Sequence, residues 1–280
     1  KKKDWKAALH FFKLSAEKGN HRGINNYVKC LIEGHGGFQK DISTAVDFLA
    51  KLCANHKTLN GNSEFMYGSI LIDKMNQIEE GKKYIMRSAL ELGNSDGLWK
   101  LGELYMKGIG FEKDFKKAKE YFTQSKDKGN KTGLFKLSEI ILYNYKTELT
   151  QLITNDNSLS SFNEHESKEI KEGFELLEKA ANLLQPEAQL STAYLMFYGV
   201  QIKNIKNEDV VFIKKDISKA IKTFQLVADR DNNAEAMFMF GTLTNDFNYI
   251  SRSARLRNDK ARISYGKMCF NMIKSNDVEK

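Results

Sequence analysis

The sequence predicts an all-α fold, a right-handed α-α superhelix (solenoid) of about six and a half helix hairpins. Three observations predict it. The 280-residue chain contains a single proline, Pro186, and helix interiors exclude proline because it lacks an N–H and clashes with the preceding turn. Helix stop signals recur along the chain, and no linker rich in Gly, Pro or Ser separates them. We therefore expect one solenoid domain over residues 1–280.

The stop signals are Gly-Asn pairs that close amphipathic runs. They stand at Gly19-Asn20, Gly93-Asn94 and Gly129-Asn130. A Gly just past the last helical residue adopts the left-handed conformation without steric cost, and Asn tolerates it. With Asn60 in the same place, the signals are 34 to 40 residues apart, which is typical of solenoid repeats.

Each unit also contains an internal break, clearest in residues 95–130. Apolar residues between Leu98 and Tyr105 follow the three-four spacing of one buried helix face. Gly102 is small where another helix must pass close. A tight loop with two glycines follows, and Asp114 is placed to cap the second helix.

The same constellation returns along the chain. The predicted repeats are 1–20, 21–60, 61–94, 95–130, 131–186 with an insertion, 187–233 with an insertion, and 234–280 as a degenerate end. The structural repeat positions are Gly34, Gly36, Asp41, Gly102, Gly108, Gly110, Asp114, Gly199 and Asp216. Because the chain opens in the second half of a repeat, we expect it to be truncated, so that any upstream targeting segment would be invisible.

One unit reads Gly-x-Leu-Tyr-x-x-Gly-x-Gly, then Asp, Lys-Ala and an aromatic pair, and ends in Gly-Asn. This pattern resembles the Sel1-like repeat (SLR), a relative of the tetratricopeptide repeat. Residues 95–130 match it strongly, 1–94 well and 168–245 with one insertion, whereas 131–167 and 246–280 match loosely. The resemblance implies a scaffold or adaptor that binds peptides or partner domains in a concave groove, as family members do in degradation and signalling complexes.

In related solenoids the first helix of each hairpin lines the concave wall, so residues between its core positions face the groove. The predicted partner-binding residues are Lys29, Glu33, Ser69, Asp73, Lys100, Glu103, Lys107, Lys136, Glu139, Tyr143, Tyr194 and Tyr198. The tyrosines matter most, because exposed aromatic side chains often anchor interfaces. Packing against the neighbouring insertion is the alternative role for them.

Two insertions interrupt the repeats, at 143–167 and 200–215. The first contains the polar run Thr154–Ser161, which predicts a long loop. The second contains Asp209–Ile213, which is apolar enough to pack locally. Both insertions are either tolerated loop growth or partner-specific contacts.

The net charge of +8 raises the question of nucleic acid. The excess is mostly lysine spread along polar helix faces, so nucleic acid is not the favoured partner. Arg252, Arg255, Arg257 and Arg262 form an arginine cluster, either one polar face of a terminal helix or a docking patch for acidic peptide, phosphate or nucleic acid. RNA binding by helical hairpins, and a structural subunit of a large assembly, are the alternative functions.

No nucleophile, phosphate-loop or metalloprotease motif is present, so we expect no catalytic residue, metal or cofactor. Cys30 with His35 and Cys53 with His56 could suggest zinc, but the repeat frame places Cys30 on a core position equivalent to Leu104. Three cysteines cannot form a closed disulfide framework, which favours a reducing, cytoplasmic location. No run reaches the 18 apolar residues of a membrane span. The oligomeric state stays open.

Overall fold

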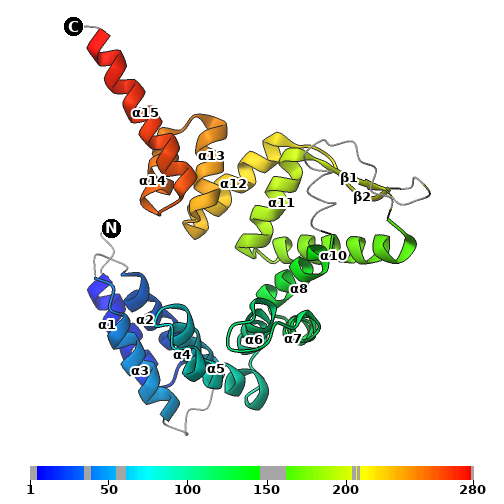
Figure 1. The fold of residues 1–280 in the computed structure, drawn as a ribbon. Coiled ribbons are helices and arrows are strands. Elements are labelled where there is room, and N and C mark those ends of the chain that lie inside the picture. Colours follow the sequence, from blue (N-terminus) through cyan, green and yellow to red (C-terminus); the bar gives the residue numbers. More distant parts are fainter. Residues whose placement is uncertain are drawn as a thin grey trace. The chain divides into compact units, whose positions relative to one another are not determined.

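The computed structural model describes residues 5–34, 39–54, 61–145, 162–203, 206 and 209–278. Within these ranges the chain is built from α-helices packed pairwise, with one short β-hairpin (Figure 1). The chain divides into two compact units, Lys1–Gly133 and Leu134–Lys280. The predicted all-α fold of repeated helix hairpins is confirmed, and the β-hairpin is an addition that the sequence did not predict.

The N-terminal unit consists of consecutive helices that pack on one another. They are α1 (Trp5–Glu17), α2 (His21–Glu33), α3 (Ile42–Ala54), α4 (Gly61–Asp73), α5 (Ile78–Met86), the π-helix η3 (Arg87–Glu91), α6 (Ser95–Lys107) and α7 (Phe115–Asp127). Buried side chains such as Leu49, Leu71, Leu101 and Phe122 form their cores. Each hairpin is too thin to bury its apolar face alone, so neighbouring hairpins complete one another's core.

Caps fix the ends of these helices as the sequence predicts. Asn94 accepts hydrogen bonds from the N–H groups of Asp96 and Gly97 at the start of α6, and Gly108 ends α6 in the left-handed conformation with φ 71°. Asp114 then caps α7 by accepting from the N–H of Lys117, 2.9 Å away. These contacts satisfy backbone groups that a helix end would leave without partners.

The other predicted repeat positions take equivalent places. Gly34 is left-handed with φ 70°, Gly199 ends α11, and Asp41 and Asp216 each accept from the N–H three residues further on. Gly110 has a positive φ. Gly102 packs against α7, where an added Cβ would lie 2.7 Å from the Phe122 ring. Gly36 lies outside the described residues.

The C-terminal unit begins inside α8 (Lys131–Tyr143). It continues with α10 (Glu164–Asn182), α11 (Pro186–Tyr198), β1 (Val200–Lys203), β2 (Asp209–Ile213), α12 (Ile217–Asp231), α13 (Ala234–Thr244), α14 (Phe247–Arg255) and α15 (Asp259–Val278). Pro186 stands at the first turn of α11, where its missing N–H costs nothing. α10 opens with a capping box between Asn163 and Glu166.

The second insertion forms the antiparallel β1–β2 hairpin, with Val200 opposite Ile213 and Ile202 opposite Val211. Its inner side chains are buried against Phe162 and other apolar residues of the C-terminal unit. The prediction that this insertion packs locally is confirmed. The polar run Thr154–Ser161 of the first insertion lies outside the described residues.

A serine in the last turns of three second helices ties each hairpin together. Ser88, Ser125 and Ser253 donate to the carbonyl of the first residue of their own first helix, at Gly61, Ser95 and Ala234. In the N-terminal unit the same serines also pack closely against a glycine of the next helix, Ser88 against Gly97 and Ser125 against Gly133. One small side chain therefore sets both the closure of a hairpin and the spacing to the next.

Candidate partner-binding surface

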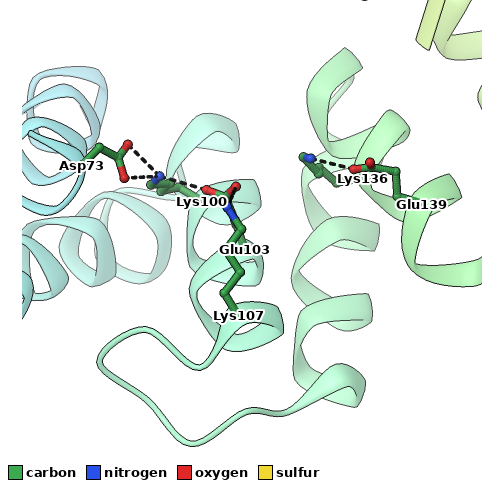
Figure 2. Close-up of polar contacts among 6 residues, drawn as sticks. All are labelled: Asp73, Lys100, Glu103, Lys107, Lys136 and Glu139. Atoms are coloured by element: carbon green, nitrogen blue, oxygen red, sulfur yellow. Dashed lines mark hydrogen bonds and ion pairs between the residues drawn. The ribbon is translucent and has the colours of Figure 1, made fainter. Parts of the chain in front are cut away.

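The predicted partner-binding face of α6 holds a network of ion pairs with α4 (Figure 2). The Nζ of Lys100 donates to both carboxylate oxygens of Asp73, at 3.0 and 2.9 Å, and to Oε2 of Glu103 at 2.9 Å. Lys107 donates to Oε1 of the same Glu103 at 2.7 Å. Lys100 is only 5% exposed. Its side chain thus joins two neighbouring hairpins rather than projecting toward a partner.

Burial and charge act against each other in this network. Burial by itself would raise the pKa of Glu103, but the ammonium groups of Lys100 and Lys107 outweigh it and hold that pKa below its usual range. Burial would likewise lower the pKa of Lys100, and the carboxylates of Glu103 and Asp73 hold it above its usual range instead. Glu103 and Lys100 therefore both stay ionised at neutral pH.

The lysines on the equivalent faces of two other first helices are paired as well. Lys136 contacts Glu139 on α8 at 2.6 Å (Figure 2). Lys29 lies 3.9 Å from Glu33 on α2. These two pairs are more exposed than the α6 network. The hydroxyl oxygen of Ser69, on α4, is buried and has no hydrogen-bond partner among the described residues.

The three predicted tyrosines fall into two classes. Tyr143 on α8 is 52% exposed, and Tyr198 on α11 is 48% exposed. Tyr194 is half-buried: its ring meets Phe224 edge-on, and its hydroxyl donates to Oε1 of Glu235 at 2.7 Å. Burial and the Glu235 carboxylate raise the pKa of Tyr194. Tyr194 therefore joins α11 to α12 and α13, whereas Tyr143 and Tyr198 present aromatic surface to solvent.

The arginine cluster is split between paired and solvated side chains. Arg252 lies over the Tyr249 ring and 3.7 Å from Asp229, and Arg262 lies 3.4 Å from Asp259. Arg255 and Arg257 are exposed and have no acidic partner within the described ranges. Half of the cluster is thus already neutralised by the protein's own carboxylates.

A pocket in the C-terminal unit was not predicted. It has a volume of about 460 Å³ and lies between α10, α11, β2 and the start of α12. Its apolar lining is formed by Phe174, Leu177, Leu195, Met196, Val211 and Ile213. The sequence signal was limited to the apolar run in the second insertion, because the α10 and α11 contributions resemble ordinary core positions.

The two cysteines whose side chains the structure describes lie in the core. Cys30 and Cys53 are buried free thiols, and burial raises the pKa of Cys53 to about 12. His35 and His56 lie outside the described residues. Among the residues described, no three His, Cys, Asp or Glu side chains gather as a metal ion would require. Within the same part of the chain, every helix is too short or too polar to cross a bilayer.

Comparison with known proteins gives one sequence family and one fold. The sequence profile of the Sel1 repeat matches residues 1–20, 95–130, 166–183 and 186–232. No curated relative matches the sequence. A Sel1 repeat protein from Oxalobacter formigenes has a similar structure, with a TM-score of 0.52 and 16% identity over 79% of this chain and 76% of that one. At this identity the likeness concerns the fold alone.

A second solved structure is a protective antigen present in uropathogenic Escherichia coli strains that displays an SLR fold. It is 18% identical, with a TM-score of 0.49, and the match covers 92% of this chain. The chain spans about half of that protein's length, 51%.

Proposed function

Because this chain belongs to the Sel1 repeat family, we propose that it is a non-catalytic scaffold that binds other proteins or extended peptides along the first helices of its hairpins. Such helices present repeated, evenly spaced surface positions, so one partner segment can contact several repeats in turn. The scaffold role is the property common to the family. The peptide-binding surface is the specific part of the proposal.

One observation supports it above the others: the predicted surface neutralises its own lysines and leaves tyrosines exposed. Lys29, Lys100 and Lys136 each lie beside a carboxylate of the same chain. Tyr143 and Tyr198 remain about half-exposed. Protein interfaces are enriched in tyrosine and depleted in lysine and acidic residues at their centres. Nucleic-acid surfaces need cations free to contact phosphates.

The test compares partner capture by matched variants. We expect Tyr143→Ala and Tyr198→Ala to reduce recovery of a bound partner by about tenfold, as loss of an interface anchor does. Leu226→Ala is the control, since Leu226 is similarly exposed on α12, a second helix. Quantitative mass spectrometry after affinity purification would measure all three. Equal recovery with the tyrosine variants and the control would overturn the proposed surface.

Single-stranded RNA is the second probe. Tight binding at about 150 mM salt that is lost on neutralising the more exposed Lys29 and Lys136 would overturn the protein-binding proposal in favour of nucleic acid.

A further inference from the structure

The pocket of the C-terminal unit combines an apolar floor with a charged rim. Protein interiors leave few voids larger than a water molecule, whereas this opening holds about 460 Å³, within the range of ligand sites. Met196 stands in its wall, and an unbranched thioether adapts to different apolar shapes. The floor therefore offers contacts that only an additional apolar group can make.

The rim carries charges of both signs from different elements. α10 contributes Glu175 and Glu178, and the segment from the end of β2 into α12 contributes Lys214 and Lys219. None of these four side chains makes an ion pair within the described ranges. Lys171 and Asp216 complete the rim, and the carboxylate of Asp216 caps α12.

This combination discriminates between classes of occupant. A fatty acid presents one negative charge, and a nucleic acid presents a row of them. Either ligand would leave the carboxylates of α10 without a partner of opposite charge. A peptide segment can carry an apolar residue between charged residues of opposite sign. Its apolar side chain would fill the floor while the flanking charges meet the lysines and the glutamates of the rim.

Building on the proposed function, we infer that this pocket binds an extended peptide through one or two apolar side chains flanked by an acidic and a basic residue. The pocket exists because the β1–β2 insertion stands beside α10 and α11. The insertion is thus a part of the binding surface, separate from the tyrosines of the first helices.

The experiment selects phage-displayed random twelve-residue peptides on the full chain. The affinity of a selected peptide, made with a fluorescein label, is then measured by fluorescence anisotropy. The pocket variant is Thr192→Arg, because Thr192 lines the pocket and its hydroxyl only bonds back to the carbonyl of Ala188 in its own helix. The matched control is Thr223→Arg, since Thr223 makes the same bond to Lys219 on α12 and does not line the pocket.

We expect Thr192→Arg to weaken binding by about tenfold or more and Thr223→Arg to change it less than about twofold. A second pair tests the rim without entering the core. The double variant Glu175→Lys, Glu178→Lys should weaken binding of peptides with a basic flank by about threefold or more, and Glu172→Lys, elsewhere on the exposed surface of α10, should not.

Other outcomes separate this inference from the proposed function. If Thr192→Arg leaves the peptide affinity unchanged but Tyr198→Ala lowers it, the pocket inference is wrong and the proposed scaffold surface is retained. A library that enriches no peptide would overturn both. A concentration-dependent dimer that Thr192→Arg abolishes, seen by sedimentation, would assign the pocket to a second copy of this chain and overturn the peptide inference.

Discussion

At the scale of single residues, the contact between Gly102 and Phe122 shows how closely α6 and α7 approach. A Cβ at Gly102 would lie 2.7 Å from the ring of Phe122, which is fully buried. Neither the backbone of α7 nor a ring held in the core can retreat without opening voids elsewhere. The sequence predicted this approach from the size of the residue alone.

Gly102→Leu is therefore expected to lower the free energy of unfolding by about 1–3 kcal/mol through overpacking. Gly266→Leu is the control, because an added Cβ at Gly266 meets nothing within 4 Å. That change should be neutral or slightly stabilising, since leucine favours a helix over glycine. Chemical denaturation of both variants measures the difference. Equal unfolding midpoints would mean that Gly102 does not face α7.

The α6 network predicts a pH dependence of stability. Because the folded-state pKa of Glu103 is lowered, its contribution is present above its unfolded pKa, about 4.3, and is lost as the pH falls through the folded value. Glu103→Gln should cost about 1–3 kcal/mol at pH 7. Urea denaturation should show this cost shrinking as the pH drops below about 4.3.

Glu139→Gln provides the matched comparison, since Glu139 pairs with a more exposed lysine on α8. An exposed pair contributes about 0.5 kcal/mol or less, so we expect little change. A Glu103→Gln deficit that is as large at pH 3 as at pH 7 would contradict the electrostatic origin.

The sequence predicted a surface position for Lys100, whereas its side chain is buried. The reason for the difference is physical. Helical periodicity says which face of α6 a residue lies on, but burial of Lys100 depends on Asp73, 27 residues earlier on another hairpin. The caps at Asp41, Asp114 and Asp216 could be predicted because each bonds to a residue three positions away. Contacts between residues close in the sequence can be predicted from the sequence, whereas contacts between hairpins cannot.

At the scale of elements, the π-helix η3 absorbs one extra residue at the end of the α5 helix. Ser88 and its glycine partner Gly97 are nine positions apart, whereas Ser125 and Gly133 are eight apart. The backbone shows the same difference of one residue. The N–H of Asn94 donates to the carbonyl of Ser88, six positions earlier, whereas the N–H of Asn130 donates to the carbonyl of Ser125, five positions earlier. A π-turn accommodates a residue in this way without breaking the helix.

Deletion of Leu90, an exposed residue of η3, should restore the spacing of eight and regular α-helix. We expect the free energy of unfolding to change by less than about 1 kcal/mol. Deletion of Asp127, the matched exposed position two residues after Ser125, should cost more than about 2 kcal/mol because it moves Ser125 out of register with Gly133. Thermal unfolding followed by circular dichroism distinguishes them. Equal losses would show that η3 is not an inserted residue.

The β1–β2 hairpin was only partly predictable. Its apolar residues indicated local packing, and β1 does alternate Val200 and Ile202 with polar residues. Strands of four and five residues are too short for such alternation to stand out from a loop. Their pairing is stabilised by burial against Phe162 and Ile170, which lie elsewhere in the sequence.

At the scale of the whole molecule, the sequence predicts a single domain, whereas the structure divides into two compact units between residues 133 and 134. The sequence carries no sign of this boundary, because it falls inside α8 and not in a linker. Repeats that contact only their neighbours make such weak points hard to see from composition. One continuous domain therefore stays a prediction.

The net charge of +8 predicts weak, salt-sensitive attraction to any polyanion. Binding to a single-stranded RNA homopolymer should fall steeply between about 50 and 200 mM salt. Arg255→Gln with Arg257→Gln should weaken binding at low salt, because these arginines lack acidic partners among the described residues.

Lys29→Gln with Lys136→Gln is the comparison, and it should change RNA binding less, since both lysines pair with glutamates. Filter binding across the salt series measures both variants. A larger loss from the lysine pair than from the arginine pair would contradict this charge distribution.

The extra residue in η3 also bears on how such a protein changes over evolutionary time. A single-codon insertion normally rotates everything after it by about 100° and would be lost by selection. Here the helix widens locally, and the serine and glycine at the junction keep their contact. Repeat lengths can then drift while junctions stay unchanged, so a lineage can accumulate insertions that blur its repeat pattern in sequence but not in structure. The Sel1 profile leaves residues 21–94 unmatched, and η3 lies within them.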